Sequence, residues 1–394
     1  MSNTNAVVDF NELQSLVHQL GRDVLRANAK DVDEKGRFPS EGFAAFKTHK
    51  LLSSYVPVKF GGMGLDILQL SKLCEIMGNY CASTAMVFAM HQIQIACIVH
   101  HCETSEYFQN FLRDLVKNQY VVASATTEVG TGGDLRSSIC AIETEGDTFR
   151  IEKQAPVVSY AKDADFIFIT CRRTAESQPS DQLQVLVDKR EMTLEQIASW
   201  SDAFGFRGTC SDGFKLKGAG NVAQIQPVPF AEILASSMHP TAHVLWSSLW
   251  LGLAQDAVNI ARQSVRQALR RNPDLPPISS MRLAEVDEML YTMRSNVLTT
   301  AADYQQKLDA NDPNVFGQFT FAIGVNNLKV RSSELVVEIV TKALYVVGIA
   351  GYKNDSPISL TRHLRDAYGA ALMVNNDRIR GHNATLQIMV RDPK

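Results

Sequence analysis

The sequence predicts a mostly helical protein with a small central β domain. Apolar residues recur at helical spacing over roughly the first 120 residues. Short β-branched and aromatic runs then follow, separated by clusters of Gly, Asp and Ser. Helical spacing returns at about residue 229 and continues to the end. We therefore expect three parts in this order: residues 1–120, 121–228 and 229–394.

The composition is that of an ordinary globular protein. Of 394 residues, 45% are hydrophobic and 21% charged, which excludes a disordered chain, a collagen-like repeat and a coiled-coil rod. Lys and Arg together number 39 against 42 Asp and Glu, giving a net charge of −3. Because the chain carries no excess of positive charge, we expect no nucleic-acid partner.

The cysteines and the apolar segments indicate the cellular compartment that we expect for the protein. Seven cysteines form an odd number without a Cys-x-x-Cys pair, so we expect neither a disulfide framework nor a metal site. Residues 1–9 lack a basic stretch followed by an apolar one. The segment 244–254 is apolar but too short to span a bilayer. We expect a reduced, cytoplasmic protein that is not embedded in a membrane.

The first part begins with an amphipathic helix in which Leu13, Val17 and Leu20 share one face. A second helical run starts near Ser40, and a loop dense in Gly and Pro covers residues 56–65. Helical spacing then resumes over 67–98.

The second part contains short runs typical of strands. They cover residues 121–126, 149–151, 166–171 and 184–187, and residues 214–216 form one of the last strands.

The third part contains long helices. An apolar face over 335–347 is wider than one surface helix needs, so it packs either inside a helical bundle or at a subunit interface. Pro273, Pro276 and Pro277 mark a loop between two of these helices.

Several motifs, in the same order and at similar spacing, resemble those of the acyl-CoA dehydrogenase superfamily of flavoproteins. Ala-Thr-Thr-Glu-Val-Gly-Thr-Gly-Gly-Asp at 125–134 resembles the family's T-E-P-x-A-G-S-D flavin loop. Phe-Gly-Phe-Arg-Gly-Thr at 204–209 resembles G-M-R-G-T, and 348–352 with 365–367 resemble G-G-x-G-Y and R-D-A. The resemblance implies a β-barrel or sandwich between an N-terminal helical domain and a C-terminal four-helix bundle.

The resemblance also implies an FAD cofactor, or FMN if the enzyme is a monooxygenase. Thr126 and Thr127 would contact the pyrimidine side of the flavin ring, and Gly132 and Gly133 would lie near the acyl-thioester carrier. Glycines let the backbone approach a planar ligand closely. Ser159 falls where the family places a short polar residue over the flavin edge, although an ordinary Ser at a strand end is equally consistent with the sequence.

Three more residues would bind the cofactor. Arg271 lies near a family Arg that reaches the cofactor pyrophosphate of a neighbouring subunit, but the Phe-Gly that follows this Arg in the family is missing here. Gly348 and Gly351 fit a close approach of backbone to phosphate.

The family's catalytic carboxylate has no counterpart in this sequence. The usual Glu lies eight residues after the Asp of R-D-A, where this chain has Val374. An alternative Glu on the first helix of the third part falls near Ala242. A carboxylate in a desolvated site is what removes the α-proton of an acyl thioester.

Four residues are candidates for catalysis in its place. Asp377, next to Asn376, could act as a displaced base, and His243 could accept a proton as a neutral imidazole near pH 7. His91 lies in a segment that by resemblance lines the substrate pocket.

We therefore expect a flavin-dependent oxidoreductase. The preferred hypothesis is α,β-dehydrogenation of an acyl thioester of CoA or an acyl carrier protein, with hydride transfer to flavin N5. The alternatives are a two-component flavin monooxygenase acting on a small aromatic or amine substrate, and a flavin- or carrier-binding protein without catalysis. The resemblance implies a homotetramer, and an electron-transfer flavoprotein or a flavin reductase as partner.

Overall fold

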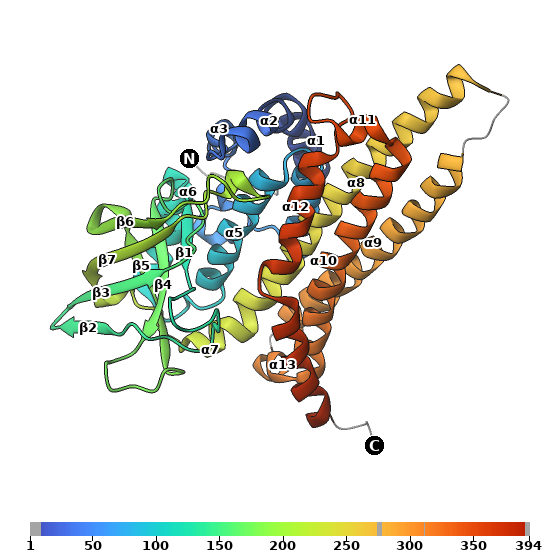
Figure 1. Ribbon diagram of the computed structural model, residues 1–394. Helices are drawn as coiled ribbons and strands as arrows, with labels where there is room; N and C mark the ends of the chain where they lie inside the picture. Colours follow the sequence, from blue (N-terminus) through green and yellow to red (C-terminus); the bar gives the residue numbers. More distant parts are fainter. Residues whose placement is uncertain (1–8, 274–277, 311, 391–394) are drawn as a thin grey trace.

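The computed structural model describes residues 9–273, 278–310 and 312–390. Its elements follow the predicted order of helices, sheets and helices, and the predicted fold class is confirmed (Figure 1). The β region packs on one side of the N-terminal helices, and the long C-terminal helices cover the other side.

The N-terminal part consists of six α-helices. α1 begins at Phe10, where the Asp9 side chain accepts hydrogen bonds from the Asn11 and Glu12 amides. The single helical run predicted over 67–98 is two helices, because the chain turns at residues 79–81. The helices are α1 (Phe10–Leu20), α2 (Arg26–Lys35), α3 (Ser40–Thr48), α4 (Ile67–Gly78), α5 (Ala82–Val99) and α6 (Glu106–Asn118).

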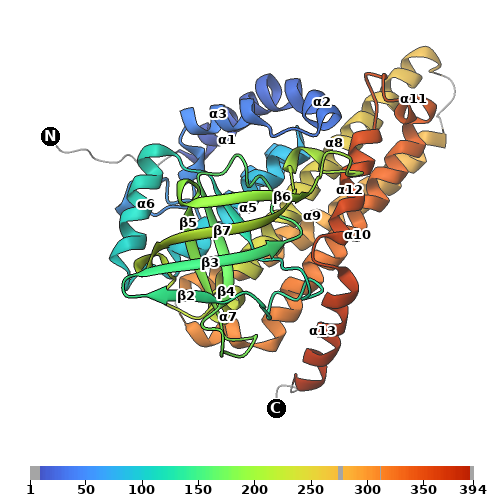
Figure 2. The same ribbon diagram turned by 60° about the vertical axis from the view of Figure 1, so that its left-hand side comes forward.

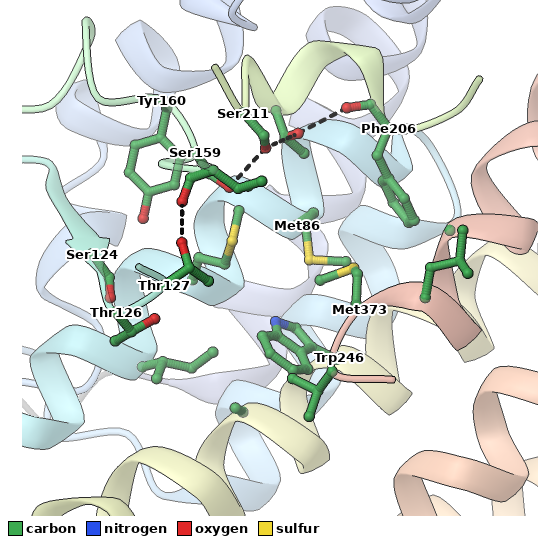
Figure 3. Close-up of a pocket in the computed structure, with 18 of the residues that line it drawn as sticks. Met86, Ser124, Thr126, Thr127, Ser159, Tyr160, Phe206, Ser211, Trp246 and Met373 are labelled. Atoms are coloured by element: carbon green, nitrogen blue, oxygen red, sulfur yellow. Dashed lines mark hydrogen bonds between the residues drawn. The ribbon is translucent and has the colours of Figure 1, made fainter. Parts of the chain in front are cut away.

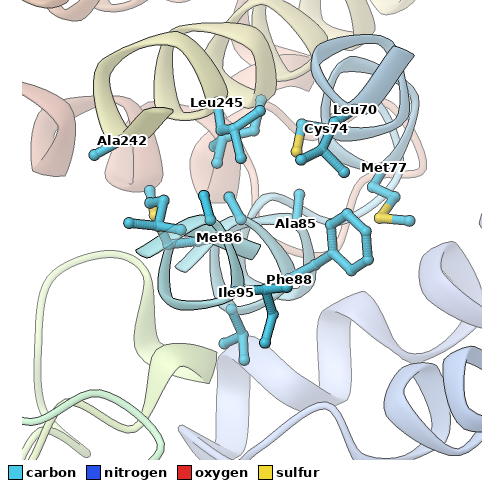
Figure 4. Close-up of a cluster of buried hydrophobic side chains, with 14 of the residues drawn as sticks. Leu70, Cys74, Met77, Ala85, Met86, Phe88, Ile95, Ala242 and Leu245 are labelled. Atoms are coloured by element: carbon cyan, nitrogen blue, oxygen red, sulfur yellow. The ribbon is translucent and has the colours of Figure 1, made fainter. Parts of the chain in front are cut away.

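Helix α5 is the central helix of the molecule. Sixteen of its eighteen residues are buried, and Figure 4 shows Ala85, Met86 and Phe88 packed among side chains of α4 and α8. Its length and composition would suffice to cross a membrane, but 89% of it is buried inside the protein. Such burial all around is typical of the core helix of a large fold.

The β region contains two sheets. β1, β4 and β5 form the first in the order β1-β4-β5, and the second has the order β2-β3-β7-β6. The sequence did not predict β2 and β6, because these edge strands expose most of their side chains and lack an apolar face. The strands are β1 (Val122–Ala125), β2 (Ile142–Glu145), β3 (Thr148–Ala155), β4 (Phe166–Arg172), β5 (Gln182–Asp188), β6 (Met192–Ala198) and β7 (Gly213–Asn221).

The C-terminal part is a bundle built around α10, with α8, α9 and α12 packed against it (Figure 2). The apolar face of α10 is buried in this bundle, since Leu335, Val336 and Ile339 are at most 2% exposed. Pro276 and Pro277 lie outside the described residues. The helices are α7 (Phe230–Ile233), α8 (His239–Arg271), α9 (Ile278–Ala310), α10 (Phe319–Val347), α11 (Ile349–Tyr352), α12 (Thr361–Leu372) and α13 (Asn376–Met389).

Candidate functional site

A pocket of about 480 Å³ lies where the three parts of the fold meet. This volume is in the range of about 300–1,000 Å³ that is typical of small-molecule sites. Its walls come from α5, the segment after β1, the loops before and after η5 (Arg207–Thr209), the start of α8 and the end of α12 (Figure 3). The lining is mostly apolar, and the hydroxyl-bearing residues in it include Ser124, Thr126, Thr127, Ser159, Thr209 and Ser211.

Four of the hydroxyls on the β side of the pocket, those of Thr127, Ser159, Thr209 and Ser211, are hydrogen-bonded to the protein. Ser211 Oγ lies 2.8 Å from Ser159 Oγ and 2.7 Å from Thr209 Oγ1 (Figure 3). Thr127 Oγ1 donates to the Val157 carbonyl at 2.9 Å. These bonds fix the directions of the hydroxyls, so this wall is preorganised.

Two of the motifs singled out in the sequence meet at this pocket. The buried carboxylate of Asp366 accepts a hydrogen bond from the Phe206 amide at 2.6 Å. A Cβ at Gly205 would lie 2.1 Å from the Arg365 carbonyl oxygen, so the close approach of the two segments requires glycine there. Burial raises the pKa of Asp366 to about 6.

The backbone around the pocket is strained at three places. Tyr160, Phe206 and Val374 all line it, and all three have positive φ, at +43°, +49° and +46°. Bulky and β-branched residues rarely adopt this conformation, and such outliers concentrate at functional sites.

The helical side of the pocket carries two histidines and a tryptophan. The ring centroids of His239 and His243 are 4.2 Å apart. Burial lowers the pKa of His239 to about 4 and that of His243 well below its usual value, so both imidazoles are neutral near pH 7. The indole Nε1 of Trp246 is buried and has no acceptor among the described residues (Figure 3). A ligand in the pocket could supply that acceptor.

No Asp or Glu side chain is among the described residues that line the pocket. Two carboxylates that contact lining residues are engaged there, since Asp366 holds the Phe206 amide and Asp33 pairs with Arg365. The acid–base groups that remain in the lining are the two neutral imidazoles, Arg365 and the phenols of Tyr160 and Tyr368.

The predicted catalytic residues do not gather at one point. His243 lines the pocket, whereas the Asp377 side chain is 91% exposed and lies 3.7 Å from Arg380. Asn376 is buried behind the wall and bonds to Ser333 at 3.0 Å.

The fourth predicted catalytic residue, His91, lies in the core outside the lining of the pocket. Its Nε2–H donates to the Leu52 carbonyl at 2.8 Å, and its Nδ1 accepts from the Val122 amide at 3.1 Å. Both ring nitrogens are therefore used to join α5 to its neighbours, which is a structural role.

The predicted cofactor-binding residues divide into two groups. Thr126, Thr127 and Ser159 line the pocket. Gly132 and Gly133 lie in the adjoining loop, with φ of +59° and +81°, and Arg378 of α13 donates to the Gly132 carbonyl.

The other predicted cofactor residues lie away from this pocket. Arg271 is the exposed last residue of α8, whose end projects beyond the rest of the molecule (Figure 1). Gly348 is the residue between α10 and α11 and lines a separate hollow, and Gly351 lies within α11.

Three residues at the site were missed by sequence reasoning. Trp246 lies one helical turn after His243, and that spacing was available as a signal. Ser211 follows the Gly-Thr of the 204–209 motif closely. The third, Lys329 of α10, lies behind the pocket wall and donates to the Val374 carbonyl at 2.7 Å, and it gave no signal because nothing in the sequence distinguishes a buried lysine from the exposed ones.

The chain matches two family models. Residues 9–119 match the acyl-CoA dehydrogenase N-terminal domain, and residues 242–373 match the acyl-CoA dehydrogenase C-terminal domain. Together these segments make up more than half of the chain. The protein therefore belongs to the acyl-CoA dehydrogenase family, as its motifs predicted, and is a flavin-dependent, dehydrogenase-like enzyme.

Curated relatives of this chain include dehydrogenases of CoA thioesters, and solved structures that share its fold include a dehydrogenase and a monooxygenase. Cyclohex-1-ene-1-carbonyl-CoA dehydrogenase of Geobacter metallireducens is 24% identical over 90% of this chain and 92% of its own. Butyryl-CoA dehydrogenase of Megasphaera elsdenii superposes with a TM-score of 0.83 at 17% identity, covering 98% of this chain and all of its own. FMN-bound TdsC of Paenibacillus sp. A11-2, a dibenzothiophene monooxygenase, superposes with a TM-score of 0.84 at 16% identity, covering 97% and 98%.

The pocket fits a flavin. The buried Trp246 Nε1–H lacks an acceptor among the described residues, as expected of a donor that faces a polar ring edge. The rest of the lining is mostly apolar. A largely apolar cavity with a few placed donors is what a planar cofactor with polar edges requires.

Proposed function

We propose that this protein is a flavin-dependent monooxygenase that oxidises a small, largely apolar substrate. The observation that carries the proposal is the absence of any carboxylate among the described residues that line the pocket. Removal of an α-proton from an acyl thioester needs a base of suitable pKa within reach of the substrate. Oxygen transfer by a reduced flavin does not need a carboxylate at that position.

The two imidazoles are poor substitutes for the missing carboxylate. A base with a pKa of about 4, as at His239, holds an abstracted proton weakly at pH 7. Burial and the neighbouring imidazole lower the pKa of His243 well below its usual value. His243 Nδ1–H also donates to the Val325 carbonyl at 3.3 Å, which fixes the ring. These side chains are better suited to orienting a ligand by hydrogen bonds than to removing a proton from carbon.

The residues proposed to hold the flavin are Thr126, Thr127, Ser159 and Trp246. A bound flavin would supply the redox chemistry by storing two electrons and passing them to O₂. The Ser159 hydroxyl is held by Ser211, and the Trp246 Nε1–H has no acceptor in the part of the chain that the structure describes. Met86 and Phe206 provide apolar surface in the lining. FMN and FAD are both candidates, since a single chain does not define where a dinucleotide would continue.

The proposed partner of a monooxygenase of this kind is a separate flavin reductase. If the enzyme is instead a dehydrogenase, the partner would be an electron-transfer flavoprotein. We also propose that the protein works in the cytoplasm as a homotetramer, and in that assembly Arg271 would reach a neighbouring subunit.

Acyl-thioester dehydrogenation remains the second candidate because the curated relatives of similar length are acyl-CoA dehydrogenases. One experiment compares the two reactions. The protein is loaded with FMN or FAD and mixed anaerobically with butyryl-CoA. In parallel, it is supplied with reduced flavin, isotopically labelled O₂ and indole, which is present with FMN in a solved complex of TdsC.

We expect labelled oxygen in the indole product and no bleaching of the flavin by butyryl-CoA. Bleaching by the thioester would support dehydrogenation and contradict the proposal. A protein that takes up neither flavin would support the third hypothesis, a protein without catalysis.

A further inference from the structure

Behind the pocket wall lies a buried lysine without a carboxylate partner. Lys329 of α10 is 0% exposed, and its Nζ donates to the Val374 carbonyl and to Asn376 Oδ1, both at 2.7 Å. Both acceptors are neutral. No carboxylate lies within salt-bridge distance of Lys329 among residues 9–273, 278–310 and 312–390. Fully buried lysines are rare and are usually paired with an acid.

The lysine fixes the backbone of the pocket wall. Val374 lines the pocket with φ at +46°, a conformation that a β-branched residue adopts only when its surroundings enforce it. The hydrogen bond from Lys329 holds its carbonyl, and Asn376 is held in turn by Ser333 at 3.0 Å. The segment 374–376 is therefore anchored to α10 through the ammonium group.

The positive charge also acts on the pocket itself. Lys329 contributes to lowering the pKa of His243, which lines the pocket, together with burial and the adjacent His239. Around Lys329, Arg380 of α13 adds positive charge and Glu334 of α10 opposes it. Counted from the R-D-A segment, Val374 falls where the resemblance places the family's catalytic Glu. A buried lysine thus lies directly behind that position.

We propose that Lys329 is the counter-charge of this pocket. Lys329 anchors the Val374 wall, and its positive charge makes the pocket bind the anionic form of its ligand in preference to the neutral form. This inference rests on the proposed flavin function. Two-electron reduction of an oxidised flavin with uptake of one proton leaves the ring with one additional negative charge. The pocket should therefore bind reduced flavin more tightly than oxidised flavin.

Two variants separate the charge from the hydrogen bond. Lys329→Gln keeps a donor for the Val374 carbonyl without the charge, and Lys329→Met removes both. Lys342→Gln is the matched control, since it removes a charge from the same helix at an exposed pair with Glu285. Dissociation constants for FMN are measured by equilibrium titration, once oxidised and once after anaerobic reduction with dithionite.

We expect the ratio of the two dissociation constants to favour reduced FMN about tenfold more in the wild type than in Lys329→Gln, as expected for one nearby charge. Lys342→Gln should keep the wild-type ratio. Because burial lowers the pKa of Lys329 to about 7, the preference should also weaken as the pH rises above that value. Equal ratios in wild type and both Lys329 variants would overturn the inference.

A readout that needs no flavin tests the same charge. In protein with isotopically labelled histidine, NMR titration should give a higher pKa for His243 in Lys329→Gln than in the wild type. If the wild type binds neither form of FMN but the His243 shift is present, the proposed function fails and the counter-charge stands. If FMN binds but neither the ratio nor His243 changes, the inference fails and the proposed function stands.

Discussion

Two buried lysines hold opposite walls of the pocket, and they differ in what accompanies them. Lys153 of β3 is 1% exposed and donates to the Thr170 carbonyl at 2.7 Å and to that of Thr126, a pocket residue, at 3.4 Å. Lys329 similarly holds the carbonyl of Val374. The difference is that Lys153 lies 3.7 Å from Glu128, whereas Lys329 has only neutral acceptors.

The carboxylate of Glu128 also organises the loop that follows β1. It accepts hydrogen bonds from the Cys140 amide at 2.6 Å, the Ile139 amide at 3.0 Å and the Ser138 hydroxyl at 2.7 Å. The pair of Glu128 and Lys153 therefore fixes one wall without adding net charge. Lys329 fixes the other wall and leaves a positive charge behind it. The comparison indicates that anchoring alone does not require an unpaired charge.

The largest effect expected from this comparison is on stability. Lys153→Met should lower the free energy of unfolding by about 3–5 kcal/mol, because it leaves the Glu128 carboxylate buried without its cation. Urea denaturation measures the loss. The double variant Glu128→Gln with Lys153→Met removes both charges and should recover part of it. If the loss of unfolding free energy in the double variant equals the sum of the losses in the two single variants, the pair does not act as a unit.

A smaller loss is expected on the other wall. Near pH 10.5, where Lys329 is neutral in the folded protein, Lys329→Met should cost about 1–2 kcal/mol, since it leaves the Val374 carbonyl without a donor and no carboxylate behind. The pH dependence gives a second check. The pKa of Lys329 is about 7 in the folded protein and 10.5 in the unfolded reference.

Between those pH values the unfolded chain binds more protons, so the stability of the wild type should rise with pH from about 7 to 10.5. This contribution is lost as the pH falls through the folded-state pKa. Urea midpoints for wild type and Lys329→Met across this range test it. Parallel curves for the two proteins would contradict a lowered pKa of Lys329 in the folded protein.

The two walls also differ in whether their polar groups already have hydrogen-bond partners within the protein. Trp246 Nε1–H has no acceptor among the described residues, so Trp246→Phe should leave stability nearly unchanged. Flavin affinity should fall about 5–10-fold, which corresponds to one hydrogen bond of about 1–1.4 kcal/mol. Fluorescence titration with FMN measures it. Unchanged affinity would show that the ligand does not accept from this indole.

The smallest effect is expected at Ser159. Its hydroxyl already bonds to Ser211, so Ser159→Ala should cost about 0.5–1.5 kcal/mol of stability. Thermal denaturation measures this cost, and Ser211→Ala is the matched variant. Since the two hydroxyls bond each other, the double variant should cost less than the sum. Strict additivity would indicate that the bond contributes little.

The sequence predicted the parts of the fold that have long and regular patterns. Helices such as α10 and buried strands such as β4 have clear apolar spacing, whereas β2 and β6 are exposed edge strands without it. The sequence singled out the 204–209 and 365–367 segments by their resemblance to known motifs, but it did not predict that they meet. The contact itself, from the Phe206 amide to Asp366, spans 160 residues and follows no local pattern.

The candidate site was predictable mainly on its β side, and on the helical side only His243 among the predicted residues lines the pocket. Thr126, Thr127 and Ser159 lie next to strands that the sequence locates, and all three line the pocket. On the helical side, the environment of Lys329 is created by Val374 and Asn376, which are 45 and 47 residues away. Whether a lysine there is buried depends on how the end of α12 returns to α10. No spacing rule in the sequence encodes that return.

The central claim is that this pocket contains a positive charge behind Val374 and no carboxylate base among its described lining residues. The most direct test is anaerobic incubation of the flavin-loaded protein with butyryl-CoA in D₂O. Visible absorbance then reports flavin reduction, and mass spectrometry reports exchange at the α-carbon. The account predicts an unchanged flavin spectrum and no deuterium at the α-carbon. Bleaching of the flavin, or deuterium at that carbon, would contradict it.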